Sequence, residues 1–532
     1  MLDILIKNGW VVDGTGNPAY PADVAIQGDT IAAVGRLAGA QAAKTIDATG
    51  KIVCPGFVDT HSHTDSTVLE NPTVESTIRQ GVTTEIVGNC GFSPAPVTDT
   101  SRTEIAGWMG RSGKETPLDW KTYGEFLDIV SRMGISENIG WLVGHGTVRS
   151  AAGIIGPNVT EDQYRAMEGM VREAMEAGAL GMSTGLEFEP GRQATTQELI
   201  RIARVVGEYD GYFTSHIRNR DARLQEAVEE FLQIVRESGT RGEVSHLNAR
   251  HNTGVAEGGW QRACDTIEKA RSQGLNVMID TTPFLHGTGQ MAAILPPWVR
   301  EGGPAATAER LKDQAVRARL RTECDRYWRF IHNGEWHRVR LLSSPEFPEV
   351  QNKTFAEISA IWGKDPWECF FDILAAAGPK LDSRGMVGHL FTDEHMAEMI
   401  RHPLFNLGVD GASRRVDGPL STQGRHPINY AGMTHYLTHH VREKKTLRLE
   451  KAIRKMTSMP ATTFGLHDRG LTQAGHKADV VVFDFDRLED VSTLEHPVAY
   501  VRGVEHVLVN GVPVIQGGEH TGARPGRNLL RK

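Results

Sequence analysis

Histidine, cysteine and aspartate residues stand at the ends of several short apolar segments in this sequence. They are His61 and His63 in DTHSH, Cys90 in GNCG, His145 in GHG, His216 in SHIR, His246 in SHLN and Asp410 in VDG. Side chains alternate along an extended segment, so His61 and His63 would project from one face. Imidazole, thiolate and carboxylate together form the ligand set that suits zinc. The residue types therefore predict a metal site, provided that the fold brings these segment ends together.

Eight short apolar runs are candidate strands, and each of these residues follows one of them. The runs are residues 56–59, 83–88, 139–143, 179–183, 212–215, 242–244, 277–280 and 405–409. Helical patterns, for example in residues 164–177 and 224–238, separate most of the runs. This alternation indicates an α/β fold with parallel strands, and eight such units in residues 53–475 predict a (β/α)8 TIM-like barrel. The alternative is a doubly wound open sheet. In a barrel, the strand ends that carry these residues form one mouth.

Two β-rich stretches and one insertion complete the predicted architecture. Residues 1–52 and 476–532 alternate like strands, and Asn510-Gly511 suits a hairpin turn, so we expect one small β domain built from both chain ends. The stretch from about 284 to 403 is too long for a loop. We therefore expect an inserted subdomain or lid at residues 284–346, before the eighth strand. Its aromatic side chains either line a pocket or form its own core; they include Trp298, Trp328, Phe330 and Trp336.

Composition and charge narrow the class of protein. The 532 residues include 58 Lys plus Arg and 66 Asp plus Glu, which gives a net charge of -8. Proteins that bind nucleic acid or anionic membranes usually have a surplus of basic residues instead. No apolar run approaches the roughly 18 residues of a membrane span, and the N-terminus lacks a signal-peptide pattern, so we expect a cytoplasmic protein. The five cysteines are never in CxxC spacing, which argues against a disulfide framework. Association into a homo-oligomer stays open.

Several segments taken together resemble a known family. GFVDTHSH, GNCGFS, GHGTVR, HIRN and EVSH, the aspartate after the eighth strand and the tail ADVVVFD...VLVNG resemble the amidohydrolase superfamily, and more narrowly its D-aminoacylase or N-acyl-D-amino-acid deacylase branch. The resemblance covers nearly the whole chain. GNCGFS is the most specific segment, because that branch uses a cysteine of the second strand as a zinc ligand where many relatives use a carboxylated lysine. The resemblance implies one tight zinc held by Cys90, His216 and His246.

The resemblance also implies a second, weaker or optional metal position near His61 and His63, with Asp410 beside it. Asp410 resembles the family's catalytic acid/base. A zinc ion lowers the pKa of bound water to about 7 and polarises a carbonyl, and a neighbouring carboxylate can take the water's proton and return it to the leaving nitrogen. The expected mechanism is direct attack of metal-bound hydroxide on an amide carbonyl, without a covalent acyl-enzyme.

Four polar residues near the predicted mouth each have two interpretations. His145 matches the family's GHG motif, and we expect it either to hold the carbonyl oxygen or to support a ligand. Glu187 and Glu189 follow the fourth strand, where relatives place a bridging group, but turn or surface carboxylates would look the same. Asp65 either orients a ligating imidazole or caps a helix.

The residues expected to recognise the substrate depart from the family pattern. Related deacylases hold a free carboxylate with a Lys after the sixth-strand His, a Tyr after the seventh strand and an Arg in a His-Pro-Arg segment. This sequence has Asn248 and Thr282 at the first two positions and no His-Pro-Arg segment after the eighth strand. Either Arg414, Arg415 or Arg425 supplies the contact from a new position, or the substrate is not a free N-acyl-D-amino acid; we expect the second.

The predicted function is that of a zinc-dependent amidohydrolase that cleaves a non-peptide or D-configured amide. Its expected partner is a small-molecule amide substrate, and we expect neither nucleic acid nor a membrane as a partner. An alternative reaction on the same site is hydrolysis of a cyclic amide or a carboxylic ester. An alternative of another class is a non-catalytic metal-binding scaffold, although a structural zinc site closed by four ligands would not need the additional carboxylate of Asp410.

Overall fold

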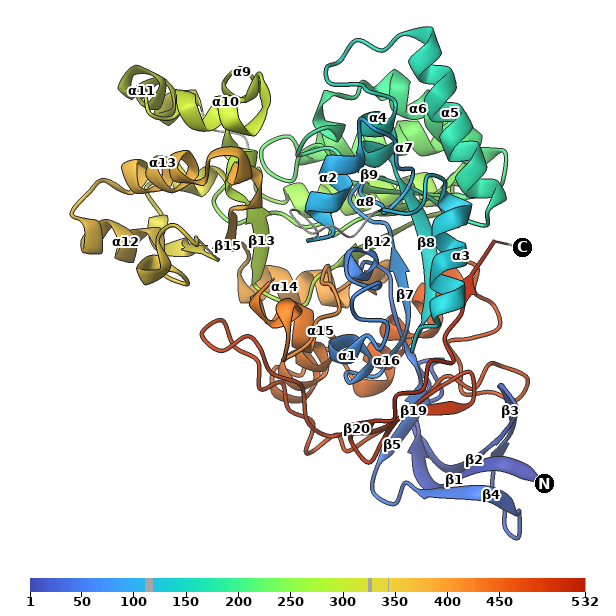
Figure 1. Ribbon diagram of the computed structural model, residues 1–532. Helices are drawn as coiled ribbons and strands as arrows, with labels where there is room; N and C mark the ends of the chain where they lie inside the picture. The colour runs from blue at the N-terminus through green and yellow to red at the C-terminus, as the bar shows by residue number, and fades with distance from the viewer. Residues whose placement is uncertain (111–117, 324–327, 343, 424, 532) are drawn as a thin grey trace.

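A parallel barrel forms the centre of the computed structural model, which describes residues 1–110, 118–323, 328–342, 344–423 and 425–531 (Figure 1). Its strands follow the order β16-β12-β11-β10-β9-β8-β7-β6. They are β6 (Phe57–Asp59), β7 (Val82–Val87), β8 (Asn138–Gly144), β9 (Gly181–Gly185), β10 (Tyr212–His216), β11 (Arg241–Val244), β12 (Val277–Thr281) and β16 (Phe405–Leu407). The segments after β6 and β16 meet, because the backbone N–H of Asp410 donates to the carbonyl of His61 and the N–H of His63 donates to that of Gly411, both at 2.7 Å. The predicted barrel is therefore confirmed over the open sheet.

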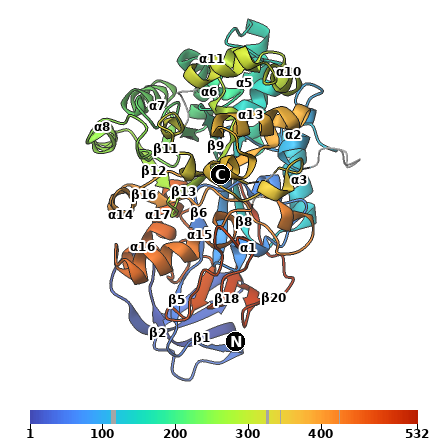
Figure 2. The same ribbon diagram turned by 90° about the vertical axis from the view of Figure 1, so that its left-hand side faces the viewer.

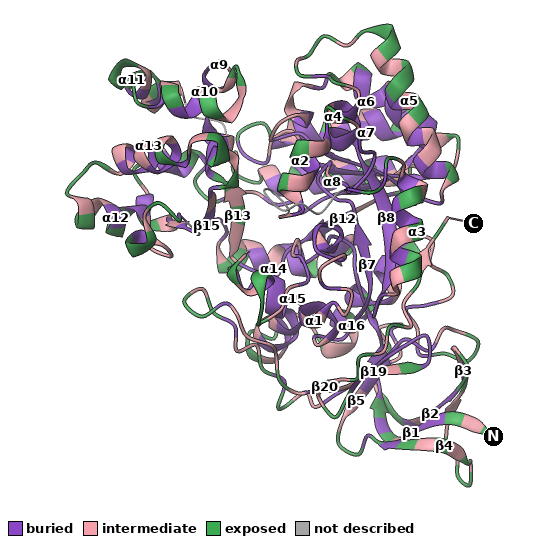
Figure 3. Ribbon diagram, in the orientation of Figure 1, coloured by how far each residue is buried: buried purple, intermediate pink, exposed green. Residues whose placement is uncertain are grey.

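Helices connect the strands and pack around the barrel. Those outside the insertion are α1 (Glu75–Ile78), α2 (Arg102–Trp108), α3 (Tyr123–Met133), α4 (His145–Ala151), α5 (Glu161–Glu176), α6 (Thr196–Gly207), α7 (Leu224–Ser238), α8 (Gly259–Ser272), α14 (Asp393–Arg401), α15 (Ile428–His435), α16 (Leu449–Met456) and α17 (Ser458–Thr463). In α5 the buried residues Met167, Val171 and Ala174 recur every three to four positions, as the inner face of an amphipathic helix requires. The helix begins at a capping box formed by Thr160 and Gln163. Figure 3 shows the buried residues gathered in the barrel strands and on the helix faces toward them.

A second, largely antiparallel sheet lies at one end of the molecule and joins the two ends of the chain (Figure 1, Figure 2). Its strands are β1 (Leu2–Val11), β2 (Tyr20–Gln27), β3 (Thr30–Gly35), β4 (Ala42–Asp47), β5 (Ile52–Pro55), β17 (Val480–Phe483), β18 (Val504–Val509), β19 (Val512–Gln516) and β20 (Glu519–His520). The two-residue turn between β18 and β19 places Asn510 at φ 48° and Gly511 at φ 79°, as a type I′ hairpin requires. We propose this sheet as the small β domain.

The last residues of the chain leave that sheet. Strand β21 (Asn528–Leu529) pairs in parallel with β8 of the barrel, and the side-chain oxygen of Asn528 accepts a hydrogen bond of 2.9 Å from the indole of Trp141. Residues 528–529, which we expected in the small β domain, therefore pair with the barrel wall.

The insertion stands beside the barrel as a separate group of elements (Figure 1). It contains a three-stranded sheet of β13 (His286–Gln290), β14 (Val339–Leu341) and β15 (Gly385–His389), with helices α9 (Pro297–Arg300), α10 (Gly303–Arg310), α11 (Gln314–Glu323), α12 (Phe355–Trp362) and α13 (Pro366–Ala377). The inserted elements extend past residue 346, because β15 pairs with both β13 and β14. Trp328, Phe330 and Trp336 are buried in this subdomain, and the ring of Trp336 packs on that of Trp367 at 4.9 Å. These aromatic residues form a core rather than a pocket wall.

Two further features concern the described parts of the chain. No helix there combines the length and the apolar character needed to cross a bilayer. Four cysteines there are buried and unbonded, namely Cys54, Cys90, Cys264 and Cys369. The fifth, Cys324, lies outside the described residues.

Candidate metal centre

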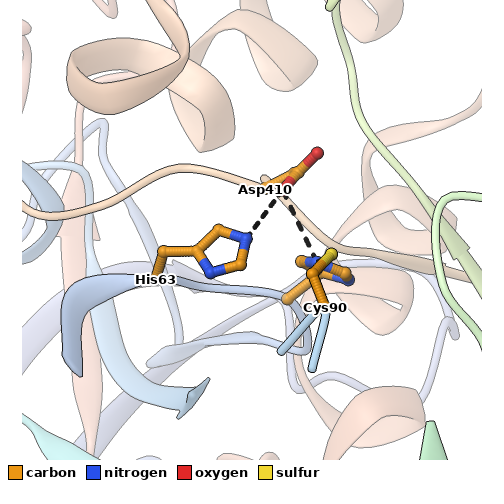
Figure 4. Close-up of side chains that lie close together, drawn as sticks. His63, Cys90 and Asp410 are labelled. Atoms are coloured by element: carbon orange, nitrogen blue, oxygen red, sulfur yellow. Dashed lines mark hydrogen bonds and ion pairs between the residues drawn. The ribbon is translucent and has the colours of Figure 1, made fainter. Parts of the chain in front are cut away.

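The six predicted metal-binding side chains lie together at the carboxyl-end mouth of the barrel. His61 and His63 follow β6, Cys90 follows β7, His216 ends β10, His246 follows β11 and Asp410 follows β16. Figure 4 shows His63, Cys90 and Asp410 converging from separate parts of the chain. The parallel strands therefore bring together side chains that are up to 349 positions apart, as for His61 and Asp410.

Cys90 belongs to two groups of possible ligands. In the first, its sulfur lies 3.7 Å from Nδ1 of His216 and 3.5 Å from Nε2 of His246. In the second, the same sulfur lies 3.3 Å from Nε2 of His61, and Asp410 Oδ1 lies 3.1 Å from Nε2 of His63. Within each group the ligand atoms are within 4.8 Å of one another. One thiolate and two imidazoles suit a zinc ion in the first group, and the added carboxylate suits a second metal position.

Three of these residues have an unusual backbone conformation. Cys90, His246 and Asp410 adopt φ values of 53°, 36° and 60°, in the left-handed region that side chains other than glycine seldom enter. The turn before Cys90 requires glycine at position 88, where a Cβ atom would collide with the carbonyl oxygen of Leu142. Such conformations cost about 1–3 kcal/mol each and cluster where a side chain must be aimed at a site. The strained turns therefore mark the mouth as functional.

The electrostatics of the first group suit metal binding. Burial raises the pKa of the Cys90 thiol, but His61, His216 and His246 outweigh this effect and hold it well below its ordinary value. Burial, followed by the charge of Arg220, lowers the pKa of His246 to about 4. The cluster thus favours a thiolate and a neutral imidazole, the forms that bind zinc.

Carboxylates contact two of the ligand imidazoles at the ring nitrogen that does not face Cys90. Glu187 Oε2 lies 2.7 Å from Nε2 of His216, and Asp280 Oδ2 lies 3.3 Å from Nδ1 of His61. Asp280 also accepts a 2.7 Å hydrogen bond from the backbone N–H of His246. Such partners fix the orientation of a ligating ring and raise its basicity. Of the two glutamates considered from the sequence, only Glu187 reaches the site.

Arginines complete this buried support. Arg220 contacts Glu187 at 3.1 Å and Nδ1 of His246 at 2.9 Å, and Arg250 donates to Glu187 at 2.9 Å and to Asp221 at 3.1 Å. Sequence reasoning missed Asp280, Arg220 and Arg250. Arg220 and Arg250 each follow a candidate ligand by four positions, which was the available signal for them, whereas Asp280 ends a predicted strand that carries no candidate ligand.

Three other predicted residues lie away from the ligand atoms. His145 is buried against Glu198, with Nε2 and Oε1 3.0 Å apart, and no hydrogen bond among the described residues joins its ring to a metal-ligand candidate. Glu189 pairs with Arg192 at 2.8 Å in a surface turn. Asp65 lies buried in a short 3-10 turn that begins after His63, and its side chain makes no hydrogen bond to an imidazole of the described residues.

A cavity of about 420 Å³ opens onto the ligand cluster and includes His63, Cys90, His216 and Asp410 in its wall. One side is aromatic, because Phe92 stacks on both Trp108 and Phe188 with ring centroids 6.1 and 5.5 Å apart. The insertion contributes residues of β13 and Leu342. Sequence reasoning did not find this wall, since isolated aromatic residues carry no spacing signal.

Of the five predicted substrate-binding residues, Arg414 is the one in the wall of this cavity among the described residues. Asn248 is buried and donates to the carbonyl of His246, and Thr282 is also buried. Arg415 pairs with Asp417 at 2.8 Å, and Arg425 is exposed.

His426 also lines the cavity and was not anticipated. The backbone N–H of Ile428 donates to its Nδ1 at 3.0 Å, so the neutral ring carries its proton on Nε2. Burial lowers the pKa of His426 to about 3. The ring is therefore uncharged, and its Nε2 is buried without a hydrogen-bond partner among the described residues.

The chain is similar to known proteins over nearly its whole length. A sequence model of the amidohydrolase family matches residues 44–515. N-acyl-D-glutamate deacylase of Alcaligenes xylosoxydans xylosoxydans is 34% identical over 542 residues, which cover 100% of this chain and 97% of that protein. The crystal structure of N-acyl-D-glutamate deacylase from Bordetella bronchiseptica, complexed with zinc and a phosphonate inhibitor, is 32% identical and has a TM-score of 0.80, with 100% of both chains covered. A D-aminoacylase structure described for its binuclear metal centre is 27% identical, with a TM-score of 0.81 and the same coverage.

Proposed function

The chain belongs to the amidohydrolase family, and we propose that it is a zinc-dependent hydrolase that removes the acyl group from an N-acylated D-amino acid or a closely related amide. As a member of this family it is a hydrolase of carbon–nitrogen bonds other than peptide bonds. The observation that carries the proposal is the pair of ligand groups that share Cys90 and lie beside the carboxylate of Asp410 at the barrel mouth.

Cys90, His216 and His246 would hold the tight metal, and His61, His63 and Asp410 a second, weaker one. The burial of Cys90, His216 and His246, and the carboxylate behind His216, support this division. A bound zinc ion supplies Lewis acidity, which polarises a carbonyl and lowers the pKa of water.

Asp410 would act as the acid and base of the reaction. Burial raises its pKa, but the positive charge of His61 and the hydrogen bond of His63 outweigh burial and lower it, so the carboxylate is ionised at neutral pH. Oδ1 lies 3.1 Å from Nε2 of His63 and 3.5 Å from Nε2 of His61. In this position the carboxylate can accept a proton from water at the mouth and pass it to the leaving nitrogen.

Hydrolysis of a defined panel by the zinc-loaded protein tests the proposal. The panel contains N-acetyl-D-leucine, N-acetyl-D-glutamate, their L enantiomers, a cyclic amide such as dihydrouracil, and an aryl ester. We expect turnover of at least one N-acetyl-D-amino acid and loss of that turnover after chelation of the metal. Turnover of the cyclic amide or the ester alone would assign the site to that chemistry, and no turnover of any compound would contradict the proposal.

A further inference from the structure

The cavity wall holds one positive charge that the metal-ligand cluster does not use. Within the described residues, the aspartate and arginine side chains in this wall are Asp410, Arg220 and Arg414, and it contains no glutamate or lysine. Arg220 is held by Glu187 at 3.1 Å and contacts both His216 and His246. Arg414 is thus the cation still available to a ligand.

The guanidinium of Arg414 is only partly satisfied by the protein. Its Nε is buried and has no hydrogen-bond partner among the described residues, and its Nη1 reaches Gln423 at the long distance of 3.5 Å. Burial lowers the pKa of Arg414, which means that solvent stabilises its charge poorly. A cation left in this state is stabilised by an anion that brings oxygen acceptors into the cavity.

The backbone of Arg414 is fixed in place before any ligand arrives. Its N–H donates to the hydroxyl of Ser76 at 2.8 Å, and its carbonyl accepts from the N–H of Ser76 at 3.1 Å. The adjacent residue, Ser413, donates its N–H to the hydroxyl of Thr64 at 2.8 Å. Little backbone ordering would therefore accompany ligand binding at Arg414.

We propose that Arg414 binds a carboxylate of the substrate and so selects acidic over carboxyl-blocked amides. This inference rests on the proposed function and reverses the expectation from the sequence that the substrate lacks a free carboxylate. The carboxylate is either the α-carboxylate or that of an acidic side chain. The planar guanidinium can meet either one with two parallel hydrogen bonds.

Calorimetric titration of zinc-loaded Asp410→Asn tests the proposal without turnover. The ligands are N-acetyl-D-leucine, N-acetyl-D-glutamate and N-acetyl-D-leucinamide, and each is titrated with and without the added substitution Arg414→Met. We expect Arg414→Met to weaken binding of at least one acid by about 10- to 100-fold and to change binding of the amide by less than about threefold. Weaker binding of both acids would identify the α-carboxylate as the group that Arg414 binds. Weaker binding of the glutamate derivative alone would identify the side-chain carboxylate.

Matched variants separate recognition from folding. Arg415→Met removes the neighbouring arginine, which pairs with Asp417 outside the cavity wall, and should leave all three affinities unchanged. Arg414→Lys keeps the charge and should retain part of the affinity for the acid. Equal weakening of acid and amide by Arg414→Met, or no binding of either acid to the parent, would overturn the proposal. Arg414-dependent binding of an acid that the wild-type protein does not hydrolyse would leave it standing and refute the proposed function instead.

Discussion

Oε2 of Glu187 lies 2.7 Å from Nε2 of His216, while the other ring nitrogen of His216 faces the sulfur of Cys90 at 3.7 Å. A carboxylate on one side of the ring and the thiol on the other fix both the orientation of the imidazole and its tautomer. His216 is thereby prepared to bind a metal through Nδ1.

Replacement of this carboxylate should weaken the tight metal site. We predict that Glu187→Gln lowers the affinity for zinc by about 10- to 100-fold, because the amide no longer supports the imidazole with a negative charge. Competition with a zinc chelator measures the effect. Glu189→Gln is the matched control, since that carboxylate pairs with Arg192 in the surface turn. Equal affinities of the two variants would contradict the role given to Glu187.

Loss of the shared sulfur should affect both ligand groups. We predict that Cys90→Ala lowers the zinc content of purified protein to well below that of the wild type, because a soft thiolate ligand is removed from each group. Elemental analysis of the dialysed protein measures this. Cys264→Ala, which removes a buried thiol from α8, should keep the wild-type content. Unchanged zinc in Cys90→Ala would remove the cysteine from the centre.

Acid should destabilise the fold through buried neutral histidines, of which His440 is a clear case. Burial lowers the pKa of His440 to about 3, although its hydrogen bond of 2.6 Å to the carbonyl of Pro283 opposes this. In the unfolded chain the imidazole of His440 has a pKa of about 6.5, so it binds a proton at pH values where the folded chain keeps it neutral. The contribution of neutral His440 to the free energy of unfolding is therefore fully present above pH 6.5 and is lost as the pH drops toward 3. At pH 5 the loss is about 2 kcal/mol.

Urea unfolding at pH 7.5 and pH 5 measures this contribution. We predict that His440→Gln reduces the difference in unfolding free energy between the two pH values by about 1–2 kcal/mol. His439→Gln removes the half-buried neighbour that contacts Glu443 and should leave the difference unchanged. If His440→Gln left the difference in unfolding free energy between pH 7.5 and pH 5 unaltered, protonation of this histidine would not be the cause of the acid destabilisation.

The sequence alone predicted the barrel and the metal-ligand candidates for a local reason. Each candidate ligand stands directly after an apolar strand pattern, and parallel strands end at the same mouth. Cys90 was identifiable because it follows a predicted strand and stands in GNCGFS, the segment most specific to the resemblance, and the structure places it between the imidazoles of His61, His216 and His246.

The features that the sequence did not predict depend on contacts between residues far apart in the chain. Asp280 ends a strand pattern, but nothing local shows that its carboxylate meets His61, 219 positions earlier. Arg414 and Arg415 are adjacent and of the same type, yet only the first lines the cavity, because Ser76 holds its backbone. The extent of the insertion depends on the pairing of β15 with β13, about 100 residues apart in the chain.

The turnover of Asp410→Asn, measured together with its zinc content, tests whether this carboxylate is the acid and base of the reaction. We predict that zinc remains at Cys90, His216 and His246 while kcat falls by about 100- to 10,000-fold, because the site keeps its metal and loses its acid and base. Asp417→Asn, at an exposed carboxylate paired with Arg415, should keep the wild-type rate. A kcat of Asp410→Asn within a few fold of the wild type would show that Asp410 is not the acid and base.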